Sequence, residues 1–445
     1  HVTGQESKIK FYDFRANHGV MQSLSTVVPY QLRKEQEDAV EQTISYKNNH
    51  ENGEFLWNAK PRFGKTLSVY DFCKKSGAKT ILIVTNIPAI ANSWYEDYMK
   101  FFGTESGYLF VSEVDALKGK PCVLSRREYI TSLMGHGDDE NYGNCIEFVS
   151  LQDMKGSKYF STNGIDKLRE VAEMNWDVLV IDEAHEGVDT YKTDVAFERI
   201  NRKFTLHLSG TPFKALANNK FDDNAIYNWT YADEQTAKRD WDVSSEKENP
   251  YAALPRLNLF TYHLSEIVKD ELKQGVEING ETEEYAFDLN EFFSTNNGKF
   301  KYDSSVDKFL DAMTLQEKFP FSTPELRDEL KHTFWLLDRV ESAKALAKKL
   351  HEHPVFEKYK IILAAGDGKI DDEEETKKSY DKVVEAISKY DKTITLSVGQ
   401  LTTGVTIPEW TAVLMLSNVK SPALYMQAAF RAQNPCLFKN GSSYA

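Results

Sequence analysis

The sequence predicts an α/β protein with two parallel-sheet units in tandem and an inserted or linking segment between them. Short apolar runs alternate with helical patterns over residues 29–215 and again over 331–445. This rhythm is typical of parallel strands joined by crossover helices. Residues 216–330 are polar and aromatic, lack the rhythm, and are assigned to the linking segment. Residues 1–28 carry no strong pattern and are expected to be the tail of a preceding region.

The composition is that of a chain able to bury more than one hydrophobic core. The 445 residues are 41% hydrophobic and 27% charged, and domains usually run about 100–200 residues. The net charge of −14 excludes a uniformly basic nucleic-acid coat. It does not exclude a local basic groove, because net charge says nothing about how the charges are distributed.

Cysteine usage and hydropathy indicate a reducing, cytoplasmic location. Cys73, Cys122, Cys145 and Cys436 form no C-x-x-C pair, which argues against a zinc ribbon or a disulfide scaffold. No apolar run approaches the roughly 20 residues that cross a bilayer, and the polar first residues do not resemble a signal peptide. Because the chain starts at His1 and stops soon after its last motif, we expect it to be an excerpt of a longer protein.

Each element of the first unit follows from a local pattern. Residues 33–46 are predicted to be a helix because Ala39, Val40 and Ile44 share one face. The apolar residues 55–57 then lead into a glycine-lysine loop. The remaining predicted elements are helices at 67–75 and 90–102 and buried strands at 80–85, 177–181 and 204–208.

The second unit repeats this alternation. A strand is predicted at 334–337 and a helix at 340–351. The acidic run 371–375 is interpreted as a solvated loop or the start of a helix. The other predicted elements are strands at 361–364, 393–397 and 412–416 and a helix at 383–390.

Residues 59–66 (AKPRFGKT) approach the phosphate-loop pattern G-x-x-x-x-G-K-[ST], between a strand and a helix. Backbone amides at a helix N-terminus bind phosphate oxygens, and Gly64 lets the backbone come close to them. Lys65 is predicted to place a positive charge on the phosphates, and the Thr66 hydroxyl to bind Mg²⁺. The predicted ligands are therefore ATP and Mg²⁺, although a chance Gly-Lys-Thr turn is the alternative for this segment taken alone.

A second motif, residues 178–185 (VLVIDEAH), delivers two adjacent carboxylates to the end of a buried strand. Ligands of parallel sheets gather at that end of the strands. Asp182 is predicted to join the Mg²⁺ shell, Glu183 to polarise the attacking water, and His185 to couple the nucleotide to the second unit. A lone Asp-Glu pair is usually a solvated turn, but four preceding apolar residues and an upstream phosphate loop favour the catalytic interpretation.

Taken in order, the motifs resemble those of DEAH-type superfamily 2 helicases and translocases, in particular the motors of type I and type III restriction enzymes. Residues 182–185 resemble the DEAH signature, and residues 209–212 (SGTP) the third motif. Residues 32–36 resemble the adenine-reading segment, 402–408 motif V, and 427–434 motif VI. The resemblance covers roughly residues 30–440 and implies two RecA-like domains.

The resemblance also implies roles for single residues. Gln36 is implied to contact adenine, Gln427 to contact the nucleotide, and Arg431 to reach the γ-phosphate from the second domain. The residues implied to couple the two domains are His185, Ser209, Thr211 and Gly404. The nucleic-acid contacts implied are Thr85, Ser150, Gln152, Thr402 and Thr403, whose hydroxyl and amide groups suit sugar–phosphate contacts that do not read sequence.

Several positions depart from the family pattern. In the phosphate loop, Ala59 replaces the first glycine, while Pro61 and Arg62 stand where small residues are common. In the later motifs, Thr406 replaces an Asp, Phe430 the usual Gly, and Asn434 the second Arg of motif VI.

The resemblance implies a nucleic-acid-stimulated ATPase that translocates on nucleic acid, with duplex DNA as the expected substrate. It would be the motor part of a restriction-modification or related defence enzyme. Nuclease, methyltransferase or specificity parts are expected outside these 445 residues, since no Asp followed by Glu-x-Lys of the restriction-nuclease type stands out. The alternatives are an RNA helicase, a phosphate-loop ATPase that ignores nucleic acid, and an inactive binding module.

Overall fold

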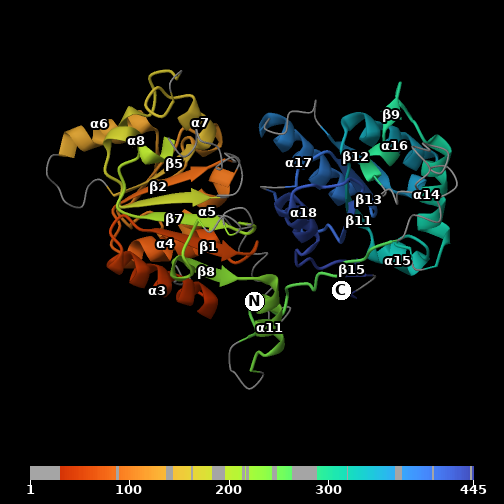
Figure 1. The fold of residues 1–445 in the computed structure, drawn as a ribbon, viewed down its shortest axis with the longest axis horizontal. Helices are drawn as coiled ribbons and strands as arrows, with labels where there is room; N and C mark the ends of the chain where they lie inside the picture. The colour runs from red at the N-terminus through yellow and green to blue at the C-terminus, as the bar shows by residue number, and fades with distance from the viewer. Residues whose placement is uncertain are drawn as a thin grey trace, which may run out of the picture.

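The computed structural model describes two α/β domains, each with its own parallel sheet and core (Figure 1). This arrangement confirms the predicted fold class. The described residues are 31–86, 90–136, 144–161, 164–182, 196–212, 216, 220–242, 248–262, 288–317, 319–365, 373–402, 405–440 and 443–444.

The first sheet has eight parallel strands among the described residues, in the order β4-β3-β5-β2-β6-β7-β1-β8. Its central strands are short, apolar and almost completely buried, as is typical of a sheet covered on both faces. The strands are β1 (Glu54–Ala59), β2 (Thr80–Thr85), β3 (Leu109–Val111), β4 (Val123–Leu124), β5 (Cys145–Ser150), β6 (Val178–Asp182), β7 (Thr205–Ser209) and β8 (Ile226–Trp229).

Alternate side chains of these strands enter two separate hydrophobic layers, because successive strand residues point to opposite faces. In β2, Ile81 and Ile83 pack with the helices on one face, whereas Leu82 and Val84 pack on the other. The first face is covered by α3 (Lys34–Asn49), α4 (Lys65–Lys75) and α5 (Ala91–Phe101). The described helices α6 (Arg126–His136), α7 (Leu151–Lys155) and α8 (Arg169–Glu173) belong to the other side.

Four strands of this sheet, β3, β4, β5 and β8, were not predicted from the sequence, and the reasons are clearest for β5 and β8. The strand β5 carries Glu147, whose charge interrupts the apolar run, yet the whole strand is buried and pairs with β2. The strand β8 has a single buried residue, Tyr227, and lies at the edge beside β1. The first domain therefore extends past the boundary predicted at residue 215.

Among the residues that the structure describes, the second sheet has four parallel strands in the order β12-β13-β11-β14. These are β11 (His332–Leu336), β12 (Lys360–Ala364), β13 (Thr393–Ser397) and β14 (Ala412–Met415). Its helices include α16 (Val340–Glu352), α17 (Glu373–Lys389) and α18 (Pro422–Ala429). The helix α17 begins ten residues before the predicted start at 383, so the end of the acidic run is the start of a helix, one of the two alternatives considered.

The second domain also begins earlier than predicted. The described segment before residue 331 contains α13 (Leu289–Phe292), the β9–β10 hairpin (Thr295–Asn296 and Lys299–Phe300), α14 (Asp303–Leu315) and α15 (Pro324–Glu329). Phe309 and Leu310 of α14 share one core with Trp335 of β11. The predicted linking segment therefore contributes to both domains, because its apolar side chains complete their cores.

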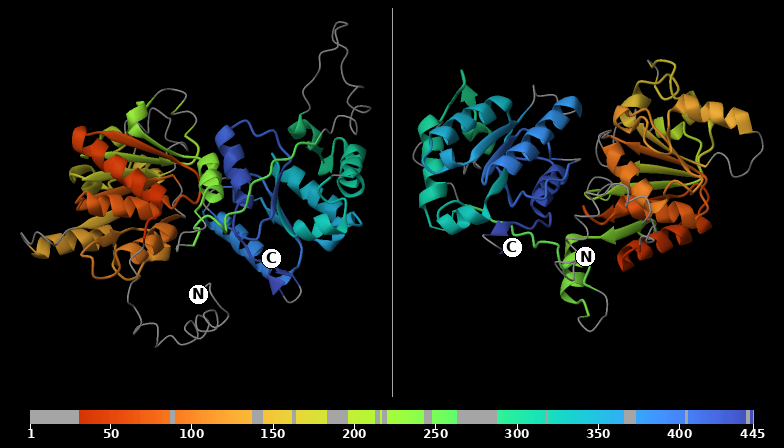
Figure 2. Two further views of the ribbon diagram at one scale, coloured as in Figure 1. Left: turned by 90° about the horizontal axis from the view of Figure 1, so that it is seen from below. Right: turned by 180° about the vertical axis from the view of Figure 1, so that it is seen from behind.

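What remains between the domains is a bridge, defined here as the described residues 230–242 and 248–262. It contains α11 (Tyr231–Arg239), whose N-terminus is closed by a reciprocal pair of hydrogen bonds between Thr230 and Asp233. Figures 1 and 2 show α11 between the two domains, followed by an extended stretch that runs to the second domain. The bridge is thus the only described chain connection between the two sheets.

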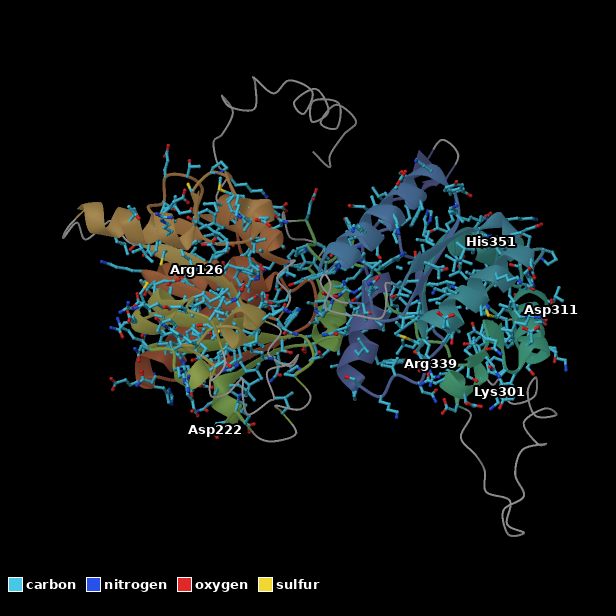
Figure 3. All side chains as sticks on the ribbon, turned by 90° about the horizontal axis from the view of Figure 1, so that it is seen from above. Arg126, Asp222, Lys301, Asp311, Arg339 and His351 are labelled. Atoms are coloured by element: carbon cyan, nitrogen blue, oxygen red, sulfur yellow. The ribbon has the colours of Figure 1, made fainter. Side chains whose placement is uncertain are left out.

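Glu147 is a buried acid in the middle of the first domain. Its Oε1 accepts a hydrogen bond of 2.7 Å from Nε of Arg126, which Figure 3 labels in that domain. The other oxygen, Oε2, is buried without a hydrogen-bond partner among the described residues. Burial raises the pKa of Glu147 from 4.5 to about 7, although Arg126 opposes the shift.

We predict that this carboxyl makes stability fall as the pH rises. Because its folded-state pKa lies above the unfolded value, its contribution is complete below about pH 4.5 and is lost as the pH passes 7. Glu147→Gln cannot ionise at this position. Its free energy of unfolding, relative to that of the wild type, should therefore rise by up to about 3 kcal/mol between pH 5 and pH 8. Urea unfolding checks this, with exposed Glu41→Gln as the control. A difference that is constant across this range contradicts the prediction.

Candidate nucleotide site and its junction with the second domain

The phosphate loop connects β1 to α4 and has the bent backbone that its sequence predicts. Gly64, the residue before α4, has φ +84°, and Arg62 has φ +73°. Glycine adopts such angles at no steric cost, whereas an arginine there is strained by about 1–2 kcal/mol. Nζ of Lys65 donates a hydrogen bond of 2.9 Å to the Ala59 carbonyl at the start of the loop.

Gln36 holds this loop from the side of α3. Its Nε2 donates to the Phe63 carbonyl at 2.8 Å, and its Oε1 accepts from the Arg33 amide at 2.8 Å. A Cβ added to Gly64 would lie 2.4 Å from Nε2 of Gln36, so only glycine permits this contact. Gln36 is completely buried, and its contact with adenine stays a prediction.

Asp182 ends β6 at the predicted place, where its side chain is almost fully buried. Its Oδ2 accepts a 2.9 Å hydrogen bond from Nε1 of Trp94 on α5. Tyr70 of α4 in turn donates from its hydroxyl to the Trp94 carbonyl and packs edge-on against its ring. The contact of Trp94 with this carboxylate was not predicted from the sequence, since nothing in the spacing of Trp94 links it to a strand end.

The third motif contacts the phosphate loop directly. A Cβ at Gly210 would meet Cδ of Pro61 at 3.1 Å and the Ala59 carbonyl at 3.4 Å. Oγ of Ser209 accepts a hydrogen bond from the Thr211 amide at 3.1 Å, which closes the turn after β7. Ser209 and Thr211 are both buried, and their role in coupling the two domains stays a prediction.

The predicted nucleic-acid contacts divide into buried and exposed side chains. Thr85 and Ser150 lie opposite each other at the ends of β2 and β5, and both are buried. Ser150 caps α7 by accepting from the Asp153 amide. Thr402 is also buried, whereas Gln152 is exposed on α7. Thr85, Ser150 and Thr402 are therefore less accessible than Gln152, and the contacts of all four with nucleic acid stay predictions.

Four predicted site residues lie outside the described residues. They are Glu183, His185, Thr403 and Gly404. Thr66 is described, half-buried in the first turn of α4.

In motif VI, Gln427 lies on α18 and Arg431 follows in the turn η5 (Phe430–Ala432). Nε of Arg431 donates to the Gln427 carbonyl at 3.2 Å, and a terminal nitrogen donates to the Val405 carbonyl. These bonds hold the guanidinium against the backbone of its own domain. Nδ2 of Asn434 donates to the Arg431 carbonyl at 2.7 Å.

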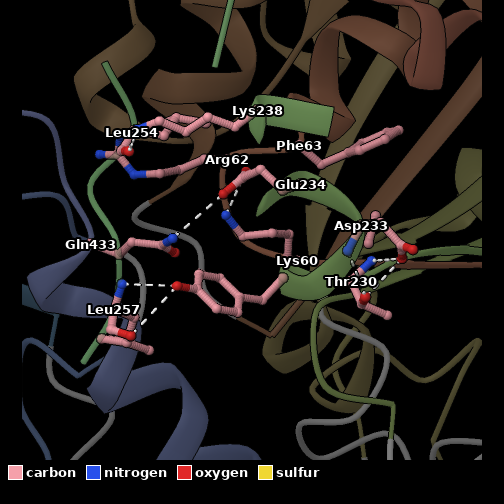
Figure 4. Close-up of polar contacts among 12 residues, drawn as sticks. Lys60, Arg62, Phe63, Thr230, Asp233, Glu234, Lys238, Leu254, Leu257 and Gln433 are labelled. Atoms are coloured by element: carbon pink, nitrogen blue, oxygen red, sulfur yellow. Dashed lines mark hydrogen bonds and ion pairs between the residues drawn. The ribbon is translucent and has the colours of Figure 1, made fainter. Parts of the chain in front are cut away.

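Motif VI meets the phosphate loop through the bridge, as Figure 4 shows. Nζ of Lys60 and Oε2 of Glu234 form an ion pair of 2.6 Å in which both side chains are 3% exposed. Oε1 of Glu234 accepts a longer hydrogen bond of 3.4 Å from Nε2 of Gln433. Arg62 donates from its guanidinium to Oδ1 of Asn434. Residues of the phosphate loop and of motif VI therefore meet at one junction.

Comparison with known proteins agrees with this architecture. Residues 29–214 match the family model of the type III restriction enzyme res subunit. This match covers most of the first domain and less than half of the chain. The chain is also 27% identical over 468 residues to a Mycoplasma pneumoniae protein whose name describes the C-terminus of a type II restriction enzyme and methyltransferase. That match covers 91% of this chain but only 62% of the relative.

A solved structure extends the likeness to both domains. It is the ATP-dependent type ISP restriction-modification enzyme LlaBIII bound to DNA, with a TM-score of 0.55 and 14% identity. The match covers 92% of this chain and 27% of that enzyme. At this identity the likeness concerns the fold alone, which is that of two tandem α/β domains.

A search for transmembrane helices gave a negative result. Among the described residues, none of the helices combines the length and the apolar character required to span a membrane.

We predict that Gly64→Ala is more destabilising than Gly77→Ala. Both glycines have a positive φ, but Gly77 has no atom within 4 Å of an added Cβ, whereas Gly64 faces Gln36. The shared backbone cost of about 1–2 kcal/mol cancels in the comparison, and the steric contact should add about 1–3 kcal/mol at Gly64. Urea unfolding of both variants measures the difference. Equal destabilisation would mean that Gln36 does not pack on the loop.

Proposed function

We propose that this chain is an ATP-hydrolysing motor that translocates along duplex DNA as part of a restriction or related defence enzyme. The observation that carries the proposal is the junction between the phosphate loop and motif VI. A phosphate group bound between two domains favours their closed arrangement, and its release favours opening. Repeated closure and opening would move the two domains along a bound polymer.

The chain offers each group that phosphate binding requires. The bent backbone before α4 and the amides of its first turn form an anion site. Lys65 lies at this site and supplies a counter-charge. Thr66 and Asp182 would hold Mg²⁺, which prefers oxygen ligands and neutralises phosphate charge. The fixed carboxylate of Asp182, held by Trp94, fits this role, and Glu183 is the proposed base for the attacking water.

Arg431 is the proposed arginine finger. Its guanidinium bonds to two backbone carbonyls, of Gln427 and Val405, in its own domain. To reach a phosphate it would have to exchange these neutral acceptors for a charged one, which forms stronger hydrogen bonds. This exchange would make finger insertion depend on the γ-phosphate. Hydrolysis would then return Arg431 to the carbonyls.

Duplex DNA is the proposed polymer because of the restriction-enzyme relatives. One of them is named as a restriction enzyme and methyltransferase, and the fold relative is described as bound to DNA. Because this chain spans 62% of the Mycoplasma relative, nuclease, methyltransferase and specificity functions are proposed for other parts of the full protein or for partner subunits. Gln152 is the exposed side chain proposed to contact the backbone of the DNA.

We predict that duplex DNA stimulates ATP hydrolysis and that Lys65→Ala lowers the stimulated kcat by about 10²-fold or more, because an electrostatic contact to the reacting group is lost. Lys75→Ala, on the exposed end of the same helix, is the matched control and should stay near wild type. The assay compares duplex DNA, single-stranded DNA, RNA and no polymer. Stimulation by RNA alone would favour an RNA helicase, and no stimulation by any polymer would favour an unrelated phosphate-loop ATPase.

A further inference from the structure

One lysine of the phosphate loop, Lys60, forms a buried ion pair with a residue outside the loop. Nζ of Lys60 pairs with Glu234 on α11 and lies 5.8 Å from the centroid of the Phe430 ring of motif VI. Burial lowers the pKa of Lys60, and the hydrogen bond to Glu234 opposes this shift. A buried pair of this kind gives little net stability over apolar residues of similar volume. Its presence therefore calls for a role other than stability.

Glu234 makes contact in two directions. One carboxylate oxygen binds Lys60, and the other accepts from Gln433, whose Nε2 also donates to the Pro255 carbonyl at 3.2 Å. Figure 4 shows Lys60 and Gln433 converging on this carboxylate from two sides. One side chain of the bridge thus joins the phosphate loop to motif VI.

The helix α11 that carries Glu234 is itself fixed. Its N-terminus is capped by Thr230, and the Tyr231 hydroxyl accepts from the Leu257 amide at 3.0 Å. The Tyr231 ring lies 6.3 Å from that of Phe430. A movement of Lys60 would therefore be passed on to motif VI, because these contacts hold α11 in place.

A second connection runs through Arg62 and Asn434. Arg62 keeps a strained positive φ, and its guanidinium reaches the Asn434 side chain. Asn434 in turn bonds to the carbonyls of Arg431 at 2.7 Å and Ile407 at 3.4 Å. Arg62 and Asn434 are two of the positions that depart from the family pattern, and here they are partners. Strain of this kind persists where the surrounding contacts require it.

We propose that Glu234 and Asn434 are positioning residues that set the place of Arg431 relative to the phosphate loop and so couple phosphate binding to the second domain. The inference rests on the proposed function, because it assumes that Arg431 serves a nucleotide at Lys65. It adds a route for the coupling, from Lys60 through Glu234 to Gln433 and from Arg62 through Asn434 to Arg431.

The test uses the full chain and two readouts. The first is hydrogen exchange of the motif VI peptide, residues 427–434, without nucleotide, and the second is kcat for duplex-stimulated ATP hydrolysis. Glu234→Gln removes the charge that holds Lys60, with exposed Glu41→Gln as the matched control. Because Glu234→Gln could unfold the chain, the pair Lys60→Met with Glu234→Met removes both charges while keeping apolar volume.

We expect faster exchange of residues 427–434 in Glu234→Gln and in the double Met variant, with the Glu41→Gln control unchanged. The kcat should fall by about 10²-fold, as expected when a reacting group is misplaced by about 1 Å, while the Kd of a fluorescent ATP analogue changes little. Asn434→Ala should act in the same direction. Unchanged exchange and unchanged kcat in the double Met variant would overturn the proposal.

The two readouts separate this proposal from the function on which it rests. If the wild type does not hydrolyse ATP, the proposed function fails, yet the exchange of residues 427–434 still reports whether Glu234 holds motif VI. If the wild type hydrolyses ATP and the Glu234 variants match it in both readouts, only the coupling route fails.

Discussion

The phosphate loop is held on three sides, and the geometry of the whole site depends on this restraint. Gln36 supports it from α3, and the third motif presses against it at Gly210. On the third side, the buried pair of Lys60 and Glu234 ties it to the bridge. A loop fixed in this way cannot shift without moving its neighbours, because packed interiors respond to strain as units. The loop is thereby connected to both domains.

The sequence predicted much of the fold because its strongest elements are periodic and apolar. The strand ending at Asp182 and the helix following Gly64 lie where the pattern predicted them. The strand β5 was missed because Glu147 interrupts its apolar run, although the charge is buried against Arg126. The limits of the linking segment were wrong because side chains such as Phe309 complete a core far away in sequence, which local patterns do not reveal.

The candidate site, like the fold, could be predicted from the sequence only in part. Motif spacing placed Lys65 and Asp182 at one edge of the sheet, since parallel strands end together. Spacing could not reveal Trp94 or Glu234, because each acts through a contact that exists only after folding. Arg62 and Asn434, read separately, weaken the match to the family. In the structure the two side chains are hydrogen-bonded to each other. The two departures from the family pattern are therefore explained only when they are considered together.

The central claim is that the junction fixes one domain against the other. Its most direct test is the distance between spin labels at exposed Glu41 on α3 and Lys382 on α17, measured without nucleotide. Cys122 and Cys436 would be replaced by serine to avoid labelling them. The account predicts one narrow distance distribution in the otherwise wild-type chain and a broad one when Lys60 and Glu234 are both replaced by Met. Equally broad distributions in the two chains would contradict it.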